Sequence, residues 1–251
     1  MAAGSGRDRR DSGTGKYFAG GQMTLSILGR CPETGMLGGA VTSSSICVAS
    51  RCLFTRSGVG AALTQNITDP ELGQWMLDLL EKGSNSTGSF GANDAVAQVV
   101  AEAEHIAWRQ LVLLDSAGKS AVHTGAKSLG IHTSAQGIQS AAAANLLANE
   151  KVPQAMVTAF EKSSGHLAQR LISALEAGIA AGGEEGPVRS AGVQVVHEVL
   201  WPIVDLRVDW DNDPISKLRT IWKEYEPQMC DYITRAINPE AAPSYGVPGD
   251  L

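Results

Sequence analysis

The chain has 251 residues, of which 43% are hydrophobic and 18% charged, and its formal net charge is −6. These values are ordinary for a globular protein, and the acidic balance argues against nucleic acid or an anionic membrane as the main partner. No apolar run approaches the roughly 20 residues that span a bilayer. The four cysteines form no CxxC pair and no cluster with zinc spacing, so no metal and no cofactor is expected.

Residues 1–22 differ in composition from the rest of the chain. They are rich in Gly, Ser, Arg and Asp, and the charged run at 7–11 has no apolar periodicity, which predicts a disordered segment. The segment lacks the apolar stretch of a secretory signal and the amphipathic stripe of a mitochondrial transit peptide. We therefore expect a cytoplasmic protein with reduced thiols. Residues 1–22 are either an extension ahead of a true start at Met23 or a propeptide removed by self-cleavage.

The first half of the remaining chain predicts strands in hairpins and two helices. Alternating apolar residues predict strands at 24–28 and 37–43, which form a hairpin around a Pro-Glu-Thr-Gly turn at 32–35. Residues 44–57 are small and polar. A buried strand is expected at 59–64. A helix then begins with Pro70 at its first position and ends at Gly83, and a second helix follows at 93–104.

The second half predicts a further hairpin followed by helices. The hairpin has strands at 108–115 and 120–124, and the state of 130–144, rich in Ser and Ala, stays open. The other features are helices at 152–163 and 167–181, apolar stretches at 191–199 and 203–208, and a helix from Asp213-Pro214 to about Tyr225. Hairpins with helices gathered between them predict an α+β fold on antiparallel sheets. We expect one domain over 23–225 and a tail over 226–251 with a short helix at 231–237.

Thr24 is the first candidate for a functional residue. Removal of Met23 would leave Thr24 with a free α-amine beside its own hydroxyl, so that one residue holds both a nucleophile and a base. Strand alternation puts Ser26 on the same face, where it lines the site or orients the amine. The alternative is an ordinary threonine in a first strand.

Short blocks spread along the chain carry a resemblance to a known family. The blocks are Thr24-Leu25-Ser26-Ile27, Pro32-Glu33-Thr34-Gly35, Gly58-Val59-Gly60-Ala61 with Thr64-Gln65, Arg109-Gln110, Asp115, His123-Thr124-Gly125, Asn145-Leu146-Leu147-Ala148, Arg170-Leu171, Ala174-Leu175-Glu176-Ala177-Gly178, Ala181-Gly182-Gly183, Arg189-Ser190-Ala191, Leu206-Arg207-Val208-Asp209 and Asp213-Pro214. In this order they resemble the Ntn-hydrolase-like family known as domain of unknown function 1028, over about 23–225.

The resemblance implies a four-layer αββα sandwich, in which two antiparallel sheets lie between helical layers. It also implies hydrolysis of a C–N amide bond, a chemistry inferred for the family mainly from its fold. Three blocks depart from the family pattern, at 144–147, 182–189 and 209–212, and the last lacks a histidine that the family carries. No role of that histidine can be transferred to this chain.

Several residues join Thr24 and Ser26 as catalytic candidates. Asn145 is an amide in an apolar run, so it is expected to be buried with a definite partner and to donate to an oxyanion, or else to cap a helix. His123 leads into a glycine and is either a proton shuttle or a hydrogen-bonded core histidine. The predicted catalytic residues are Thr24, Asn145, Ser26 and His123.

Eight more residues are candidates for binding the substrate. Ser44 and Ser45 end the second strand near Thr24, and Thr64 and Gln65 end a buried strand. Arg109 and Asp115 bracket a strand and are expected to pair or to bind a substrate carboxylate, whereas Arg207 and Asp209 lie two apart on one strand and form an ion pair by default. The predicted binding residues are Ser44, Ser45, Thr64, Gln65, Arg109, Asp115, Arg207 and Asp209.

Two functions therefore remain open. The first is a cytoplasmic hydrolase of a small amide, lactam or ureido compound, in which Thr24 attacks the carbonyl and Asn145 holds the oxyanion. The second is a non-catalytic structural or assembly protein in which Thr24 stays inside the chain. In either case the sheet edges and Ala-rich surface favour a homo-oligomer.

Overall fold

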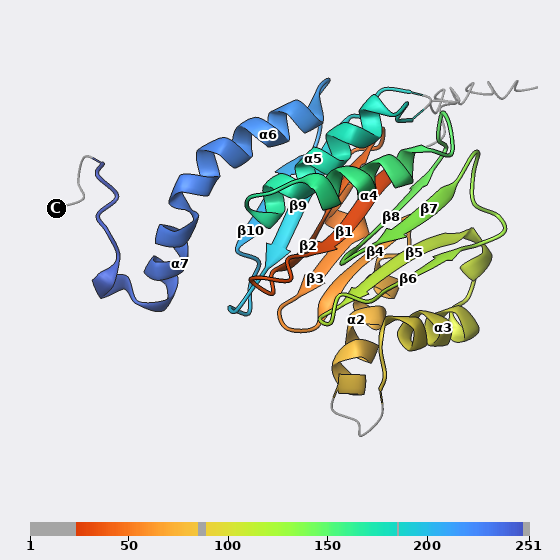
Figure 1. The fold of residues 1–251 in the computed structure, drawn as a ribbon, viewed down its shortest axis with the longest axis horizontal. Helices are drawn as coiled ribbons and strands as arrows, with labels where there is room; N and C mark the ends of the chain where they lie inside the picture. The colour runs from red at the N-terminus through yellow and green to blue at the C-terminus, as the bar shows by residue number, and fades with distance from the viewer. Residues whose placement is uncertain (1–23, 85–88, 185, 248–251) are drawn as a thin grey trace, which may run out of the picture.

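The computed structural model describes residues 24–84, 89–184 and 186–247. The predicted extension at 1–22 lies outside these residues. Two antiparallel sheets stack face to face, with helices on the outer face of each (Figure 1). This arrangement confirms the predicted α+β class and the sandwich of two antiparallel sheets.

The larger sheet has six strands in the order β10-β9-β2-β1-β8-β7. Its strands are β1 (Thr24–Arg30), β2 (Leu37–Ser43), β7 (Thr133–Gly137), β8 (Ser140–Asn145), β9 (Ser190–Val196) and β10 (Val204–Val208). Strand β1 has a neighbour on both sides, and the register sets Thr24 opposite Ser43 on β2 and Asn145 on β8. The first residue of β1 is therefore held from both directions.

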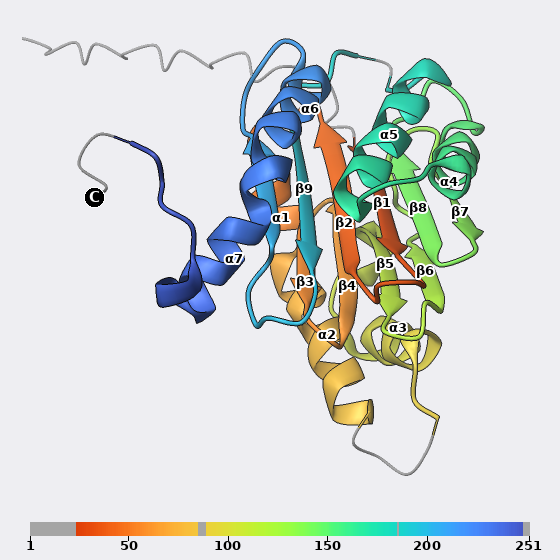
Figure 2. The ribbon, with the colours of Figure 1, turned by 60° about the vertical axis from the view of Figure 1, so that its left-hand side comes forward.

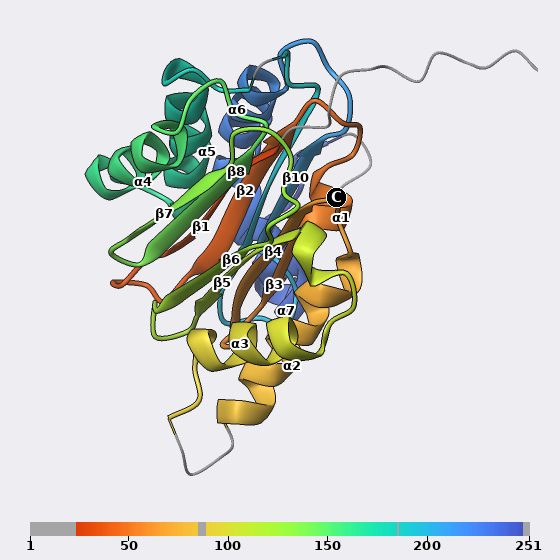
Figure 3. The ribbon, with the colours of Figure 1, turned by 90° about the vertical axis from the view of Figure 1, so that its right-hand side faces the viewer.

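The smaller sheet has four strands in the order β3-β4-β5-β6. Its strands are β3 (Leu53–Arg56), β4 (Gly60–Asn66), β5 (Arg109–Asp115) and β6 (Ser120–Thr124). Helices α2 (Pro70–Ser84) and α3 (Ala92–Glu102) cover its outer face (Figure 3). Helices α4 (Val152–Lys162) and α5 (Leu167–Ala180) cover the outer face of the larger sheet.

Shorter elements complete the chain. They are α1 (Ala49–Cys52), η1 (Ile106–Trp108), η2 (Glu226–Gln228) and η3 (Pro239–Ala241). Helix α6 (Pro214–Tyr225) packs beside the β10 side of the larger sheet and leads into α7 (Met229–Ile237), which extends beyond the sheets (Figure 2). None of the helices in the described ranges is long and apolar enough to cross a membrane.

Strand alternation divides the apolar side chains into three layers. On β1, Leu25 and Ile27 pack outward beneath α4 and α5, whereas Leu28 packs inward against the smaller sheet. A third layer joins the smaller sheet to α2 and α3, where Met76 and Leu111 are buried. Thr24 and Ser26 share the inward face with Leu28, so their side chains lie between the sheets.

The structure differs from the predicted elements in two segments. The open segment at 130–144 forms β7 and most of β8, in which Ala141 to Ala144 are all fully buried. Alanine has a weak strand preference, but its small side chain suits a strand that is packed on both faces. Residues 44–57 contain α1 and β3, each only four residues long and too short to leave a periodic signal.

Close packing of α4 on β1 generates a testable prediction. A Cβ added at Gly29 would lie 2.5 Å from Cε2 and Cζ of the Phe160 ring, so Gly29→Ala should lower the free energy of unfolding by about 1–3 kcal/mol. The double variant with Phe160→Leu should lose less than the sum of the two single variants, because leucine lacks those ring atoms. Urea denaturation measures both effects, and strict additivity would contradict this packing.

Candidate active site

The inner faces of both sheets turn from apolar to polar at the end where β1 begins. The buried inward residues at this end are Thr24, Ser26, Ser43, Asn145 and Ser190 from the larger sheet, and Gln65 and Gln110 from the smaller one. Farther along the same strands the inward residues are apolar, as at Leu28, Leu63 and Val112. A concentration of polar side chains in one part of a core is the usual setting of a functional site.

A row of hydroxyl groups leads from Thr24 toward α1. The Thr24 side chain is only 5% exposed, and its Oγ1 donates to Ser43 Oγ at 3.5 Å. The hydroxyls of Ser43 and Ser45 lie 2.8 Å apart, and the Arg51 guanidinium donates to Ser45 Oγ. This row connects the Thr24 hydroxyl to a positive charge at the surface.

A chain of buried amides crosses from one sheet to the other beside Thr24. Ser26 Oγ donates to Gln65 Oε1 at 2.6 Å, and Gln65 Nε2 donates to Gln110 Oε1 at 2.7 Å. The same Gln110 oxygen accepts from Asn145 Nδ2 at 3.3 Å. Gln110 Nε2 lies 3.2 Å from Thr124 Oγ1, which continues the chain into β6. Because buried polar groups need partners, these bonds fix the position of every member.

The side-chain oxygen of Asn145 is an acceptor without a partner among the described residues, and it lies on the strand next to Thr24. Asn145 is fully buried and stands opposite Thr24 in the register. Its Oδ1 has no hydrogen-bond partner among the described residues, although an unmade bond at such a buried acceptor costs about 1–3 kcal/mol. Its position therefore suits a donor that arrives from a ligand or from a free chain terminus.

Backbone strain also gathers at this end of the sandwich. Cys47, Asn66 and Leu146 have φ angles of 53°, 70° and 51°, in the left-handed region that residues with a Cβ rarely adopt. They follow β2, end β4 and follow β8, the strands that carry Ser43, Gln65 and Asn145. Such residues cost about 1–3 kcal/mol each and concentrate at functional sites.

Glu184 is a buried carboxyl at the same end. It forms an isolated antiparallel bridge with Leu147, two residues after Asn145, and its side chain is 8% exposed. Burial raises the pKa of this carboxyl to about 8, although the backbone amide and the hydroxyl of Ser44 act to lower it. Neither carboxyl oxygen makes a hydrogen bond of ordinary geometry with the described residues, so the contact with Ser44 is loose.

Two predicted residues face away from Thr24. On β6, Ala121 and His123 point to the layer beneath α3, whereas Val122 packs between the sheets. On β4, Thr64 points to the α2 side and donates to the carbonyl of Asp69 at 3.1 Å. The structure therefore does not bring His123 or Thr64 to Thr24, because each lies one step out of phase with the inward face.

Arg109 and Asp115 do not pair. Arg109 lies 3.7 Å from the Asp69 carboxylate at the Thr24 end of β5. Asp115, at the opposite end, accepts from the amides of Ala117 and Lys119 at 3.0 and 2.9 Å. The expectation of an ion pair was wrong because the two residues bracket the full length of the strand, and Asp115 instead orders a turn.

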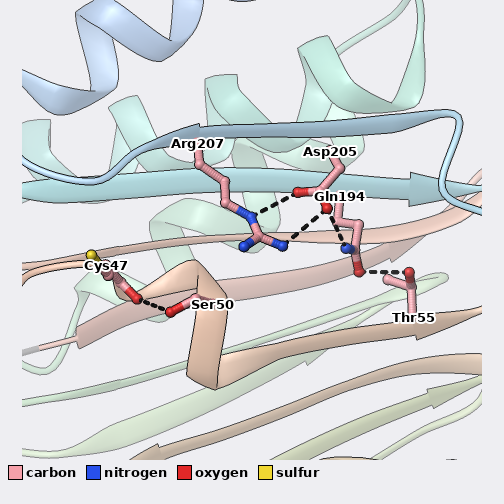
Figure 4. Close-up of polar contacts among 6 residues, drawn as sticks. All are labelled: Cys47, Ser50, Thr55, Gln194, Asp205 and Arg207. Atoms are coloured by element: carbon pink, nitrogen blue, oxygen red, sulfur yellow. Dashed lines mark hydrogen bonds and ion pairs between the residues drawn. The ribbon is translucent and has the colours of Figure 1, made fainter.

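The predicted ion pair of Arg207 with Asp209 is not formed, because Arg207 pairs with Asp205 instead. Arg207 forms two hydrogen bonds with Asp205, at 2.9 and 3.0 Å, and Gln194 links Asp205 to Thr55 on the smaller sheet (Figure 4). Asp205 is likewise two residues from Arg207, so spacing alone could not separate the two carboxylates. This network ties the β10 edge to β3 and lies apart from Thr24.

The sequence analysis missed three residues that the structure adds to the site. The inward direction of Gln110 was detectable, because it alternates with Val112 and Leu114 on β5, but its pairing with Gln65 on β4 was not, since α2 and α3 separate the two strands in the chain. Arg51 and Glu184 lie on α1 and in the segment after α5, where no periodic pattern indicates which way a side chain points. Of the predicted residues, the structure brings together Thr24, Ser26, Ser45, Gln65 and Asn145.

Two surface hollows lie away from Thr24. One, of about 260 Å³, opens between α5 and α6 and is lined by Glu176 and Arg219. The other lies beside Asp115 and Phe90, at the opposite end of the sandwich from Thr24. Neither contains a residue of the hydrogen-bonded chain at Thr24, so the polar end of the core is the better candidate for chemistry.

The fold and the site together define the class of protein. It is an α+β sandwich with a polar site around a threonine between its two sheets. The chain belongs to the family of unknown function DUF1028, whose model matches residues 24–218. The crystal structure of protein SPO2555 from Silicibacter pomeroyi, of the same family, is 30% identical over 84% of this chain and 89% of that one, with a TM-score of 0.76. These matches confirm the resemblance found in the sequence.

A second solved structure is more distant. Anbu, the ancestral beta-subunit from Yersinia bercovieri, is 13% identical over 82% of this chain and 96% of that one. Its TM-score of 0.34 is too low to support an argument about the fold. No curated protein matches the chain.

Removing the centre of the amide chain should destabilise the protein. Gln110→Ala takes away the acceptor shared by Gln65 and Asn145, leaving buried donors unsatisfied, so the free energy of unfolding should fall by about 2–4 kcal/mol. The exposed Gln154→Ala should change it by less than about 0.5 kcal/mol. Guanidinium denaturation measures both, and equal losses would contradict a network that holds the sheets together.

In the full-length chain, Glu184 should make stability fall as the pH rises. Its pKa is raised from 4.5 to about 8, so the folded chain binds the proton more tightly than the unfolded one, and stability is lost between these two values. The loss is on the order of 2–5 kcal/mol. Glu184→Gln should remove this part of the pH dependence. Urea denaturation at pH 5 and pH 8 checks it, and an unchanged slope in the variant would contradict the assignment.

Proposed function

We propose that this protein is an N-terminal nucleophile (Ntn) hydrolase that cleaves a C–N amide bond in a small molecule, with Thr24 as the nucleophile. One observation carries the proposal. Thr24 is the first residue of a strand held on both sides, and its side chain lies between the sheets beside a buried polar network. A chain that begins at Thr24 would present its α-amine at the same point.

The proposed reaction uses the two functional groups of one residue. The free α-amine takes the proton of the Thr24 hydroxyl while Oγ1 attacks the substrate carbonyl, which gives a tetrahedral intermediate. Protonation of the leaving nitrogen by the α-ammonium breaks the C–N bond and leaves an ester on Oγ1. Water, activated by the α-amine, then hydrolyses the ester and releases the carboxylic acid and the free hydroxyl.

Asn145 is the proposed oxyanion donor. It stands opposite Thr24, and its Nδ2 makes a single hydrogen bond, to Gln110 Oε1. An amide donor beside the attacked carbonyl stabilises the charge that develops on oxygen, an effect commonly worth about 3–4 kcal/mol. Ser26 and Gln65 act indirectly: Ser26 donates to Gln65, Gln65 donates to Gln110, and Gln110 holds the Asn145 amide in place.

The substrate is proposed to be a small amide, lactam or ureido compound. Thr24 is 5% exposed, and Ser43 at the end of β2 contacts it with Ser45 behind, which leaves little room for a polypeptide. The Arg51 guanidinium at the end of the hydroxyl row favours a substrate with an anionic group, because a guanidinium binds carboxylates through several donors. A non-catalytic role is the alternative.

Activity measurements on a chain expressed from Met23 test the proposal. Thr24→Ala should lower the hydrolysis of every substrate that turns over by at least about 100-fold, whereas Thr24→Ser, which keeps a hydroxyl, should retain most of it. Product amine or ammonia is assayed over a panel of amides, lactams and ureido compounds. The exposed Thr220→Ala serves as the matched control and should match the parent.

Intact mass of the purified full-length protein tests the maturation step. Loss of residues 1–23 would support a functional terminus at Thr24. Undiminished activity in Thr24→Ala, or in a chain that keeps all residues ahead of Thr24, would overturn the N-terminal mechanism and favour the non-catalytic role.

A further inference from the structure

Gly183 and Glu184 lie beside the segment that follows β8, near the end of the larger sheet at which β1 begins. The register that sets Thr24 opposite Ser43 and Asn145 would put a preceding residue between positions 44 and 146. One position farther along, Glu184 bridges Leu147, and the amide of the next residue, Ala148, donates to the Gly183 carbonyl at 3.2 Å. Glu184 also approaches Ser44 on the other side. By this register Glu184 lies two positions ahead of Thr24, and its contact with Ser44 directs the carboxyl toward the start of β1.

No cation among the described residues balances this carboxyl. Ser44 faces it from the end of β2, and Leu147 and Ala148 face it from the segment after β8. No charged side chain among the residues that the structure describes contributes to its pKa, which burial raises. A buried carboxylate without a cationic partner is strongly destabilising. The carboxyl therefore suits a cation that is present in only one form of the protein.

We infer that Glu184 is the partner of the Thr24 α-amine and holds the terminus of a chain that begins at Thr24. An α-ammonium at the start of β1 would supply the missing charge within hydrogen-bond reach of the carboxyl. Glu184 is thus a positioning residue, because it acts on the substrate only through the terminus. The inference rests on the proposed function in one respect, the existence of a chain that begins at Thr24.

The pairing also explains how the amine becomes a base. An α-ammonium ordinarily loses its proton near pH 7.7–8.0, close to the value of about 8 to which burial raises the pKa of Glu184. When the ammonium passes its proton to the carboxylate, both groups become neutral and no charge stays buried. The neutral amine is then free to accept the proton of the Thr24 hydroxyl. The two groups titrate as a coupled pair.

The pH titration of the α-amine tests this pairing directly. Both sheets and all three apolar layers lie within the described residues, so a chain expressed from Met23 keeps all the packing that the structure describes. Its α-nitrogen is followed by NMR after labelling with ¹⁵N-threonine. Glu184→Gln should lower the midpoint of the amine titration by at least about one pH unit, because the ammonium loses its carboxylate. The exposed Glu104→Gln should leave the midpoint unchanged.

A comparison of two unmutated chains covers the case in which Glu184→Gln does not fold. The full-length chain should lose stability between about pH 5 and pH 8, whereas the chain that begins at Thr24 should not, since its ammonium balances the carboxylate. An unshifted amine titration in Glu184→Gln, or the same pH slope in both unmutated chains, would overturn the pairing.

The Thr24→Ala variant separates this inference from the proposed function. It keeps a terminal amine, so with ¹⁵N-alanine labelling its amine titration should match that of the parent even though hydrolysis is lost. Full activity in Thr24→Ala would refute the role of Thr24 as nucleophile without contradicting the pairing of Glu184 with the α-amine. An unchanged amine titration in Glu184→Gln would refute the pairing without contradicting the role of Thr24 as nucleophile.

Discussion

The site depends on the hydrogen bonds that cross between the two sheets at the end where β1 begins. Gln110 Oε1 accepts from Gln65 and from Asn145, so one oxygen joins β4, β5 and β8. In a low-dielectric interior an amide that loses such a partner carries the full cost of its desolvation. This requirement fixes the separation of the sheets there and the orientation of the Asn145 amide, which the pairing of β1 with β8 sets opposite Thr24.

The rest of the sandwich supplies a rigid frame for that network. Strand β1 is clamped between β2 and β8, and Leu25 and Ile27 anchor it beneath α4 and α5. Because the outward and inward residues of β1 are locked by different layers, Thr24 cannot rotate away from the inner face without breaking the core. A nucleophile held on such a strand needs no loop closure to be positioned.

The sequence predicted the frame better than the site. Periodicity located the helices and most strands, and alternation on β1 correctly set Thr24 and Ser26 on one face. His123 was a catalytic candidate from the sequence, but the structure turns it outward because it alternates with the inward Val122 and Thr124. Glu184 could not be predicted, because its position depends on a bridge to Leu147 formed by chain segments without regular structure.

A covalent label on the nucleophile is the most direct test of the central claim that Thr24 acts as a terminal nucleophile. A β-lactone acylates a nucleophilic hydroxyl by ring opening, and peptide mass spectrometry locates the ester formed. The account predicts a single adduct on the peptide that begins with Thr24, and no adduct in Thr24→Ala. An adduct elsewhere, or equal labelling of a chain in which Thr24 is not the terminus, would contradict it.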